Sequence, residues 1–229
     1  MMMKRNIFKG HFVTLEGGEG SGKTTLLHQL AACLTQRGYD VITTREPGGT
    51  RLGETIRDWL LHQDPSTSIG HQAELLLFLA ARAQHIEEKI IPALEAGKIV
   101  LCDRFNDSTI AYQGGARGLG IRYVKKLCQL ICGAVMPQLT LFLNVSPEIG
   151  LSRSKSVHKE HALSGELDRI ESEALSFHRK IQQTLEFLAK REPLRIYTID
   201  ANQPQDLVLK EAITVLDELI FLPGQKGGL

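Results

Sequence analysis

Glycines, a lysine and a threonine between residues 17 and 24 have the spacing G-x-x-x-x-G-K-[ST], in the segment GGEGSGKT. Glycines allow successive backbone N–H groups to curl around a phosphate, and a helix that begins at this point adds positive potential. The Lys23 ammonium can reach the β- and γ-phosphates of a nucleotide, and the Thr24 hydroxyl can ligate Mg²⁺. We therefore expect a phosphate-binding loop whose nucleotide-binding residues are Gly17, Gly18, Glu19, Gly20, Ser21, Gly22, Lys23, Thr24 and Thr25.

A phosphate-binding loop serves many reactions, so other features must select among them. The sequence has no N-K-x-D-like segment that would read guanine, which disfavours a GTPase and leaves ATP as the expected nucleotide. The 229 residues include 27 Lys+Arg and 26 Asp+Glu, and this formal net charge of +1 argues against a protein that coats nucleic acid or a membrane. The remaining classes are a kinase of nucleoside monophosphates, a kinase of another small molecule and an ATP-dependent switch protein.

Two charged segments follow predicted strands, at the position where ligands bind in open α/β sheets. Arg45 lies in TREPGGT (residues 44–50), beside a tight turn that can wrap around a small molecule. Asp103 can hold a metal ion, and the neighbouring Arg104 can bind a phosphate group. A structural turn and a surface ion pair are the alternative interpretations of these two segments.

Other side chains can recognise a base and a sugar. The run STIAYQGG (residues 108–115) combines hydroxyl, amide and aromatic groups. Phe78 and Arg82 are one helical turn apart, so a ring that stacks on a base and a guanidinium that binds its edge would share one face. The apolar periodicity of residues 75–79 favours the alternative that Phe78 belongs to the core.

Short β-rich runs alternate with longer segments of helical periodicity, which is typical of a parallel sheet with crossover helices. We expect an α/β P-loop NTPase fold of three layers, in which helices flank a five-stranded parallel sheet and a mobile lid is attached. The expected strands are His11–Glu16, Asp40–Thr44, Lys98–Cys102, Leu139–Asn144 and Arg195–Ile199. The expected helices are Lys23–Arg37, Arg51–His62, Gln72–Ala96 (kinked or ended by Pro92), Ile121–Cys132, Pro147–Ser154, Glu166–Lys190 and Gln205–Leu222.

One domain of this fold is expected over residues 11–222, between a flexible lead-in (1–10) and a flexible tail (223–229). A polar and basic stretch predicts the lid at about residues 150–168. We find no secretory signal and no apolar run long enough to span a membrane. The four cysteines lack a disulfide or zinc spacing and indicate buried thiols in a reducing compartment, so we expect a cytoplasmic protein.

Five segments together resemble thymidylate kinases of the bacterial type. They are TREPGGT (44–50), residues 80–82, residues 103–105, STIAYQGG (108–115) and ELDRIE (166–171), and the matches run in order from about residue 12 to residue 200. The resemblance implies a P-loop nucleoside monophosphate kinase that transfers the γ-phosphoryl group of ATP to dTMP, with Mg²⁺ as cofactor. It also implies a homodimer, for which the helices over residues 72–96 and 121–132 are candidate interface elements.

The resemblance further implies roles for individual residues. Phe78 would stack on thymine, Arg82 would bind its O4 edge, and Tyr112 would crowd the position of a ribose 2′-OH. Arg45 and Arg104 would hold the dTMP phosphate. The full set of residues implied for dTMP is Glu19, Arg45, Glu46, Pro47, Phe78, Arg82, Arg104, Ser108, Thr109, Tyr112 and Gln113, and the metal ligands would be Thr24 and Asp103.

The source of the catalytic cations follows from the family's subtypes. Ser21 stands where one subtype carries an arginine in the phosphate-binding loop, so we expect the lid region to supply the cations. The expected catalytic residues are Lys23, Arg104, Arg153, Lys155 and Arg169. Two features depart from the family pattern: Phe105 follows Asp-Arg where Tyr or His is more usual, and the lid carries the extra segment SVHKEHALSG (156–165).

Overall fold

The computed structural model describes residues 8–61, 68–160 and 169–221, and these residues contain a five-stranded parallel sheet. The strands are β1 (His11–Glu16), β2 (Val41–Arg45), β3 (Ile99–Asp103), β4 (Leu139–Asn144) and β5 (Ile196–Asp200). They lie in the order β2-β3-β1-β4-β5, so that the strand before the glycine-rich loop is central. The predicted α/β fold class is confirmed.

Three strands end one residue later than predicted, each on a charged residue. Arg45 pairs with Asp103 across β2 and β3, and Asp200 pairs with Asn144 across β5 and β4. The backbone ladder includes these residues because its hydrogen bonds do not depend on side-chain polarity. As a result, the carboxyl ends of neighbouring strands deliver polar side chains to one edge of the sheet.

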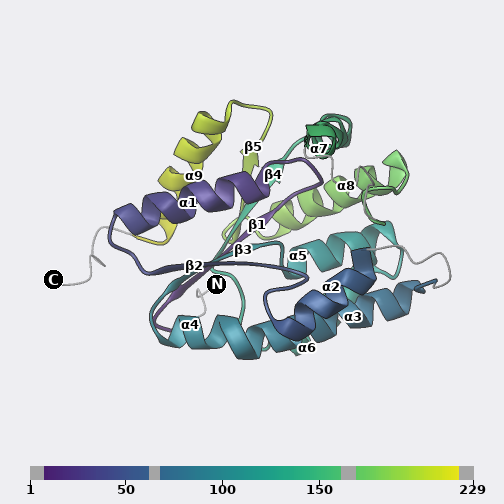
Figure 1. Ribbon diagram of the computed structural model, residues 1–229, viewed down its shortest axis with the longest axis horizontal. Helices are drawn as coiled ribbons and strands as arrows, with labels where there is room; N and C mark the ends of the chain where they lie inside the picture. The colour runs from purple at the N-terminus through teal and green to yellow at the C-terminus, as the bar shows by residue number, and fades with distance from the viewer. Residues whose placement is uncertain (1–7, 62–67, 161–168, 222–229) are drawn as a thin grey trace.

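Helices cover both faces of the sheet (Figure 1). On one face, α1 (Lys23–Gln36) and α9 (Gln205–Leu219) form a core with the inward side chains of β1, β3, β4 and β5. On the other face lie α3 (His71–His85), α6 (Ile121–Cys132) and α8 (Leu175–Arg191). Along β1, Val13 and Leu15 contribute to the first core and Phe12 to the opposite side, as the alternation of a strand buried on both faces requires.

The helix predicted over residues 72–96 consists of three consecutive segments. α3 is followed by a π-helical stretch, η1 (Ile86–Ile90), and then by α4 (Ile91–Glu95), whose first turn contains Pro92. A proline lacks an N–H, and its ring clashes with the carbonyl four residues earlier in an α-helix. The wider turns immediately before Pro92 allow the helical path to continue through it.

Residues 106–116 form a helix that the sequence pattern does not predict. α5 (Asn106–Thr109) continues into a second π-helical stretch, η2 (Ile110–Ala116), although the segment reads as a polar run with glycines. The Glu16 carboxylate accepts hydrogen bonds from the backbone N–H groups of Phe105 (2.8 Å) and Ser108 (3.3 Å) at the start of this helix. Tertiary capping and burial therefore override weak local propensity here.

The elements beside the predicted lid also differ from expectation. α7 (Pro147–Glu160) continues past the predicted end at Ser154, and α8 begins at Leu175 rather than at Glu166. The start of α8 is delayed because residues 169–173 form turns, in which Arg169 N–H donates to the Leu61 carbonyl (3.0 Å) at the end of α2 (Arg51–Leu61). Residues 161–168 of the predicted lid lie outside the described residues.

The predicted lead-in is packed where it can be described. Phe8 lies against the cluster that η1 and α4 form with β1 and β3, and Gly10 N–H donates to the Leu94 carbonyl (2.9 Å). Residues 1–7 and the predicted tail lie outside the described residues. In the described part of the chain, no helix is both long and apolar enough to cross a bilayer.

Candidate active site

The glycine-rich loop joins β1 to α1, with Lys23 as the first residue of the helix. The Lys23 side chain is buried, and its Nζ donates to the Gly18 carbonyl (2.7 Å) and the Ser21 hydroxyl (3.1 Å). Burial, together with the charge of Arg104, lowers the pKa of Lys23 to about 8. The loop lines a cleft of about 540 Å³, here termed the loop cleft, which also contains Arg45, Asp103 and Arg104.

A second cleft of about 750 Å³, here termed the outer cleft, opens beside the same loop. It is lined by Gly20, Ser21 and Gly22, by residues 152–154 and 156 of α7, and by the loop over residues 201–205. Arg153 of α7 donates from Nη1 to the Ala201 carbonyl (2.9 Å), which ties α7 to that loop. The backbone of the phosphate-binding loop therefore separates two adjoining clefts.

The loop and α7 touch through glycines. A Cβ atom on Gly20 would lie 1.9 Å from the Gly150 carbonyl oxygen, and one on Gly150 would lie 2.2 Å from the Glu19 carbonyl oxygen. Gly20 also has φ +62°, a conformation that favours glycine. Only a pair of residues without side chains allows this approach, which brings α7 and its Arg153 to the edge of the loop.

Thr24 and Asp103, the two predicted metal ligands, lie next to each other. Thr24 Oγ1 donates to Asp103 Oδ2 at 2.6 Å, from the first turn of α1 to the last residue of β3. A hydroxyl and a carboxylate oxygen are hard donors of the kind that Mg²⁺ prefers, so this pair fits a magnesium ion shared with nucleotide phosphates.

Arg104 is held in an unusual backbone conformation, with φ +66°. This left-handed geometry is costly for a residue with a side chain. It turns the guanidinium toward the loop, where Arg104 donates to the Gly17 carbonyl (2.9 Å) and to Glu19 Oε1 (2.5 Å) and lies over the Tyr112 ring. The Arg104 side chain therefore links the phosphate-binding loop to the segment after β3.

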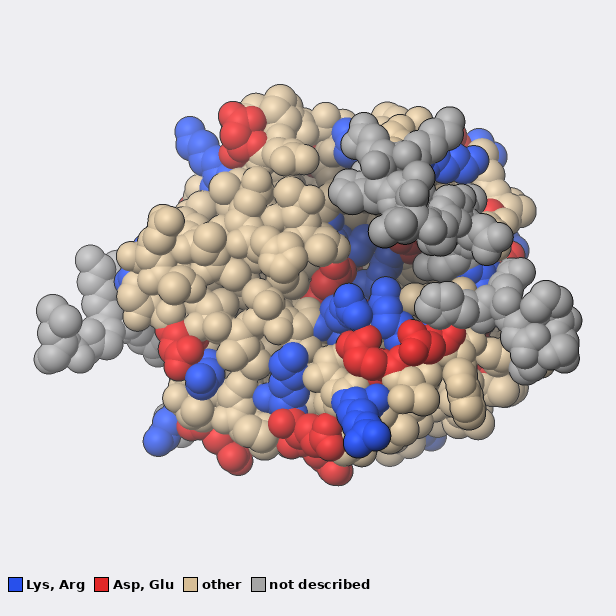
Figure 2. Space-filling view, viewed as in Figure 1, with Lys and Arg blue, Asp and Glu red and all other residues tan. Residues whose placement is uncertain are grey.

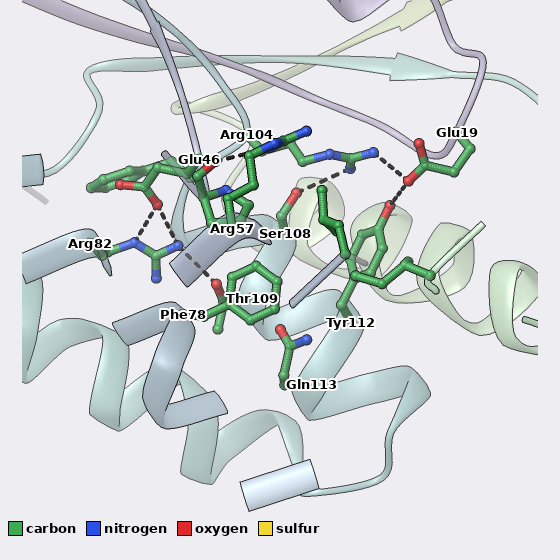
Figure 3. Close-up of a pocket in the computed structure, with 14 residues that line it drawn as sticks. Glu19, Glu46, Arg57, Phe78, Arg82, Arg104, Ser108, Thr109, Tyr112 and Gln113 are labelled. Carbon is green, nitrogen blue, oxygen red and sulfur yellow. Dashed lines mark hydrogen bonds and ion pairs between the residues drawn. The ribbon is translucent and has the colours of Figure 1, made fainter. Parts of the chain in front are cut away.

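Glu19 is the acceptor between Arg104 and Tyr112. Its Oε1 accepts a hydrogen bond from the Tyr112 hydroxyl at 2.8 Å (Figure 3). Burial disfavours the charged carboxylate, but the charges of Arg104 and Lys23 and the bond from Tyr112 outweigh burial and lower the pKa of Glu19 to about 2. The carboxylate is therefore ionised at neutral pH, and it fixes the Tyr112 ring at the mouth of a third cavity.

This third cavity, here termed the inner pocket, has a volume of about 90 Å³ and lies between the loop and α3 (Figure 3). Phe78 lines it, is only partly buried and also packs against two core clusters, so one side chain belongs both to the pocket wall and to the edge of the core. Arg82 and Thr109 face it from α3 and α5, joined by a hydrogen bond from Arg82 Nη2 to Thr109 Oγ1 (2.8 Å). The residues that line the inner pocket are Glu19, Glu46, Pro47, Arg57, Leu61, Phe78, Arg82, Arg104, Phe105, Ser108, Thr109, Tyr112, Gln113 and Ile170.

Gln113 contributes an acceptor to the inner pocket. Its Nε2 donates to Glu74 Oε1 at 2.8 Å, and since a carboxylate only accepts hydrogen bonds, this contact fixes which end of the amide is oxygen. The Oε1 atom of Gln113 is buried and has no hydrogen-bond partner among the described residues. A buried carbonyl oxygen without a partner in the wall of a pocket is a place for a ligand N–H.

The structure brings most of the predicted residues together, but Arg169 lies elsewhere. Its Nε donates to the Leu60 carbonyl (2.8 Å) and its Nη2 to Glu74 Oε2, at the side of the inner pocket remote from the loop. Its neighbour Ile170 lines that pocket. These contacts anchor the turn that follows the predicted lid. An arginine surrounded by acceptors can serve packing as readily as catalysis.

The remaining predicted cations differ in their surroundings. Arg45 lines the loop cleft and pairs with Glu54 at 2.9 Å. Lys155 is exposed on α7 and lines none of the three cavities. Figure 2 shows lysine and arginine side chains gathered with acidic ones around a hollow beside the loop, whereas the face over α1 carries little charge.

Two charged residues that line the site are absent from the sequence predictions. Arg57 of α2 lines both the inner pocket and the loop cleft, and its Nη1 donates to the Pro47 carbonyl (2.9 Å). No local signal marks it in the sequence, because a charged residue in a helix has the same pattern whether or not it faces a substrate. Glu171 lines the loop cleft and accepts a hydrogen bond from the Ser154 hydroxyl (2.8 Å), and its place in ELDRIE was the signal there.

The fold and the adjoining cavities define a class of protein: a P-loop kinase whose phosphate-binding loop faces a second, separate pocket for a small acceptor. Comparison with known proteins gives the family. The model of the family described as thymidylate kinase matches residues 15–212, and the chain therefore belongs to the thymidylate kinase family.

Individual relatives agree with this assignment over most of their length. A thymidylate kinase from Protochlamydia amoebophila (strain UWE25) is 62% identical over 211 residues, which cover 92% of this chain and 94% of that protein. A thymidylate kinase from Geobacillus thermodenitrificans (strain NG80-2) is 46% identical over 211 residues, covering 92% and 91%. The crystal structure of thymidylate kinase from Ehrlichia chaffeensis matches with a TM-score of 0.70 and 34% identity, covering 91% of this chain and 98% of that one.

Proposed function

We propose that this protein transfers the γ-phosphoryl group of ATP to the phosphate of dTMP, giving dTDP and ADP. One observation carries the proposal beyond family membership: the inner pocket and the loop cleft share four charged residues. Glu19, Glu46, Arg57 and Arg104 line both cavities. A donor phosphate at the loop and an acceptor phosphate at the mouth of the inner pocket would therefore meet at two shared cations, Arg57 and Arg104.

The polar groups of the inner pocket suit a thymine ring. Thymine presents an imide N–H between two carbonyl oxygens, and the unpartnered Oε1 of Gln113 is an acceptor for such an N–H. Arg82 can donate to the O4 carbonyl, while Phe78 offers a ring for stacking. Thr109 and Ser108 complete the polar wall, and Pro47 contributes to the apolar one. Cytosine would place an acceptor where thymine has its N–H and would lack the carbonyl at position 4.

Tyr112 and Glu19 are suited to the sugar. The Tyr112 ring is pinned by Glu19 and Arg104, so it can exclude a 2′-hydroxyl without moving. The remaining oxygen of Glu19 is available for the 3′-hydroxyl. A ribonucleotide would be rejected because its 2′-hydroxyl clashes with the fixed ring. The 3′-hydroxyl would be accepted because it can donate to a charged carboxylate.

The reaction needs little chemistry from the protein apart from alignment and charge neutralisation. The second pKa of a phosphate monoester is about 6, so the acceptor is mostly dianionic at neutral pH and needs no general base. Lys23 binds the donor phosphates, and Arg104 neutralises charge between donor and acceptor. Arg45 and Arg57 hold the acceptor phosphate. Arg153 and Lys155 of α7 are the proposed cations for the transferring group, and we assign Arg169 to the support of the inner pocket instead.

Mg²⁺ is the proposed cofactor, held by Thr24 and Asp103. In the described part of the chain, no group of three or more His, Cys, Asp or Glu side chains converges as a metal site. The protein would thus supply two oxygen ligands and leave the remaining positions to the nucleotide phosphates and water, as is usual for this ion. When bound, Mg²⁺ would neutralise negative charge on the nucleotide phosphates.

An acceptor panel tests the proposal directly. ADP release from ATP-Mg²⁺ is measured with dTMP, dUMP, dCMP, AMP and GMP as single acceptors. We expect the highest kcat/KM with dTMP. Equal or higher turnover of a different nucleotide would refute the assigned acceptor, and ATP hydrolysis indifferent to all five would refute the kinase.

We further propose a homodimer in the cytoplasm. Leu76 of α3 and Tyr123 and Leu130 of α6 are 60%, 47% and 69% exposed on helices that pack side by side, and large exposed apolar side chains of this kind suit an interface. Cys102 and Cys128 are free and buried, which favours a reducing compartment. Sedimentation of Leu130→Glu should show a monomer, whereas Leu194→Glu, at an exposed site between α8 and β5, should sediment as the wild type does.

A further inference from the structure

A continuous chain of buried polar contacts runs from Arg82 through Glu46 to His85 and Thr44. Thr44 Oγ1 and His85 Nε2 are 2.7 Å apart, and His85 Nδ1 lies 2.9 Å from Glu46 Oε1. The other oxygen of Glu46, Oε2, accepts from Arg82 Nε at 2.7 Å. Arg82, Glu46 and His85 are 1%, 4% and 0% exposed, so none of these contacts competes with solvent.

Hydrogen-bond chemistry fixes the direction of the contact between His85 and Glu46. A carboxylate only accepts, so His85 must carry a proton on Nδ1 in order to bond Glu46. In the neutral ring Nε2 is then an acceptor, and the Thr44 hydroxyl donates to it. Both oxygens of Glu46 are thereby committed, one to His85 and one to Arg82. Only one orientation of the Glu46 carboxylate satisfies both contacts, and this orientation also fixes the plane of the Arg82 guanidinium.

The donors of Arg82 show why that orientation matters. Its Nε and Nη2 groups are used by Glu46 and Thr109, and one Nη1 hydrogen faces Cys128 Sγ at 3.6 Å. The guanidinium therefore has little bonding capacity left for a ligand, and the direction of the remaining donor decides what the inner pocket can bind. A small rotation would move a charged donor away from a base carbonyl.

We propose that His85 is a positioning residue for base recognition: by donating to Glu46 it holds Arg82 in the orientation that binds a nucleotide base with a carbonyl oxygen at position 4. This inference rests on the proposed function and deepens it. His85 lines none of the three cavities, so it acts only through Glu46 and Arg82. A Cβ atom on Gly49 would lie 2.7 Å from both His85 Nε2 and Thr44 Oγ1, so the glycine of the TREPGG turn makes room for this contact.

Two amide substitutions separate positioning from packing. The amide nitrogen of His85→Asn can occupy the place of Nδ1 and still donate to Glu46. The longer His85→Gln places its amide near the position of Nε2, where it contacts Thr44 and leaves Glu46 Oε1 without its donor. We expect His85→Gln to raise the KM for dTMP about tenfold, or roughly 1.4 kcal/mol, with kcat and the KM for ATP near their wild-type values. We expect His85→Asn to stay within about twofold of wild type, since it retains the donor.

The selectivity of the variants is the sharper readout. The ratio of kcat/KM for dTMP over dCMP should narrow in His85→Gln, because the base carbonyl that Arg82 reads is replaced by an amino group in cytosine. Thr44→Val, which removes only the outer end of the chain of contacts, should shift the ratio in the same direction by less. His71→Gln, at an exposed site on the same helix, is the matched control and should leave the ratio unchanged.

The outcomes are distinct. Equal dTMP KM values and equal selectivity in His85→Gln, His85→Asn and the wild type would overturn the inference, provided that all three melt at similar temperatures. A parallel loss in kcat, in the KM for ATP and in the KM for dTMP would also overturn it, because it would show a purely structural role. A wild-type protein that does not phosphorylate dTMP would refute the proposed function itself and the inference with it.

Discussion

The inner pocket and the loop cleft lie side by side but are built by different means. In the inner pocket, buried side chains orient one another: Arg82 is 1% exposed and paired with Glu46, and Gln113 is oriented by Glu74, which is 0% exposed. At the loop, the groups that face phosphate are glycine backbone and a lysine that bonds within the loop. Rigid side-chain pairs suit recognition of one particular base, whereas backbone N–H groups recognise phosphates that every nucleotide carries.

The two regions also differ in volume and in how exposed their charged side chains are. The inner pocket has a volume of about 90 Å³, against about 540 Å³ for the loop cleft and about 750 Å³ for the outer cleft. The Arg45 side chain of the loop cleft remains 54% exposed. Substitutions at the loop should therefore affect turnover with any acceptor, whereas substitutions in the inner pocket should mainly change which acceptor is used.

The largest effect is expected from Lys23→Ala. Removing the cation that binds the donor phosphates should lower kcat by about 10³-fold, near the upper end of the range for loss of one group that stabilises developing charge. The KM for dTMP should change little, since Lys23 does not line the inner pocket. Steady-state kinetics and a melting curve check this, with the exposed Lys190→Ala as control. Near-wild-type turnover of a folded Lys23→Ala protein would contradict the assignment of the loop.

Arg104 belongs to both regions, so its loss should affect both substrates. We expect Arg104→Gly to lower kcat/KM for ATP and for dTMP by about 10²-fold each. Thermal stability should fall only slightly, because glycine adopts φ +66° without strain and this gain offsets part of the lost ion pair with Glu19. Kinetics in both substrates and a melting temperature test this. An effect confined to one substrate would show that Arg104 belongs to one region alone.

A smaller effect is expected at the sugar. Tyr112→Ala should narrow the preference for dTMP over UMP about tenfold, because the ring that fills the position of the 2′-hydroxyl is removed. Tyr112→Phe keeps the ring and loses only the bond to Glu19, and it should retain most of the preference. Competition assays with the two nucleotides give the ratio directly. If Ala and Phe variants discriminate equally well, the ring does not exclude the ribose.

The smallest effect concerns the stability of the helix that carries Ser108 and Tyr112. Burial, with the nearby charge of Asp107, raises the pKa of Glu16 from 4.5 to about 7. The folded protein then holds a proton that the unfolded chain releases, so the resulting stabilisation is complete below pH 4.5 and is lost as the pH rises through about 7. Between about pH 5 and pH 7.5, the melting temperature of Glu16→Gln should therefore decline less than that of wild type, by about 2–4 °C. The exposed Glu95→Gln should follow the wild-type curve, and a Glu16→Gln curve parallel to wild type would contradict the raised pKa.

Periodicity predicts the sheet and the longer helices of this protein because apolar spacing and strand burial are local signals. β1, β4 and α6 have the predicted bounds, since each contains an apolar pattern that ends at a turn or a polar residue. The helix over residues 106–116 was not predicted, because its capping by Glu16 comes from a strand far away in the sequence. Long-range contacts of this kind leave no local pattern.

The residues of the candidate site likewise divide into those that the sequence predicts and those that it does not. Motif spacing predicts the loop, Asp103 and Arg104, since phosphate binding requires specific residues at strand ends. Motif spacing overlooks Arg57, and the family resemblance names Arg169 among the catalytic cations. A charged residue in a helix or turn has the same local pattern whether it faces a substrate or a buried carboxylate. The direction of the Arg169 side chain is set by its surroundings, above all by Glu74 of α3. Phe78 fits the core pattern for a related reason: a pocket wall and a core have the same apolar periodicity, and this side chain lies at both.

The glycine contact between the phosphate-binding loop and α7 constrains how this enzyme can vary. Because Gly20 and Gly150 meet backbone to backbone, no side chain between them can yield when either segment shifts. A displacement of the loop upon binding of phosphate would be passed directly to α7, and thereby to Arg153. The two glycines, far apart in the sequence, therefore constrain each other: a side chain at either one would meet backbone atoms of the opposite segment, which no substitution in that segment can remove.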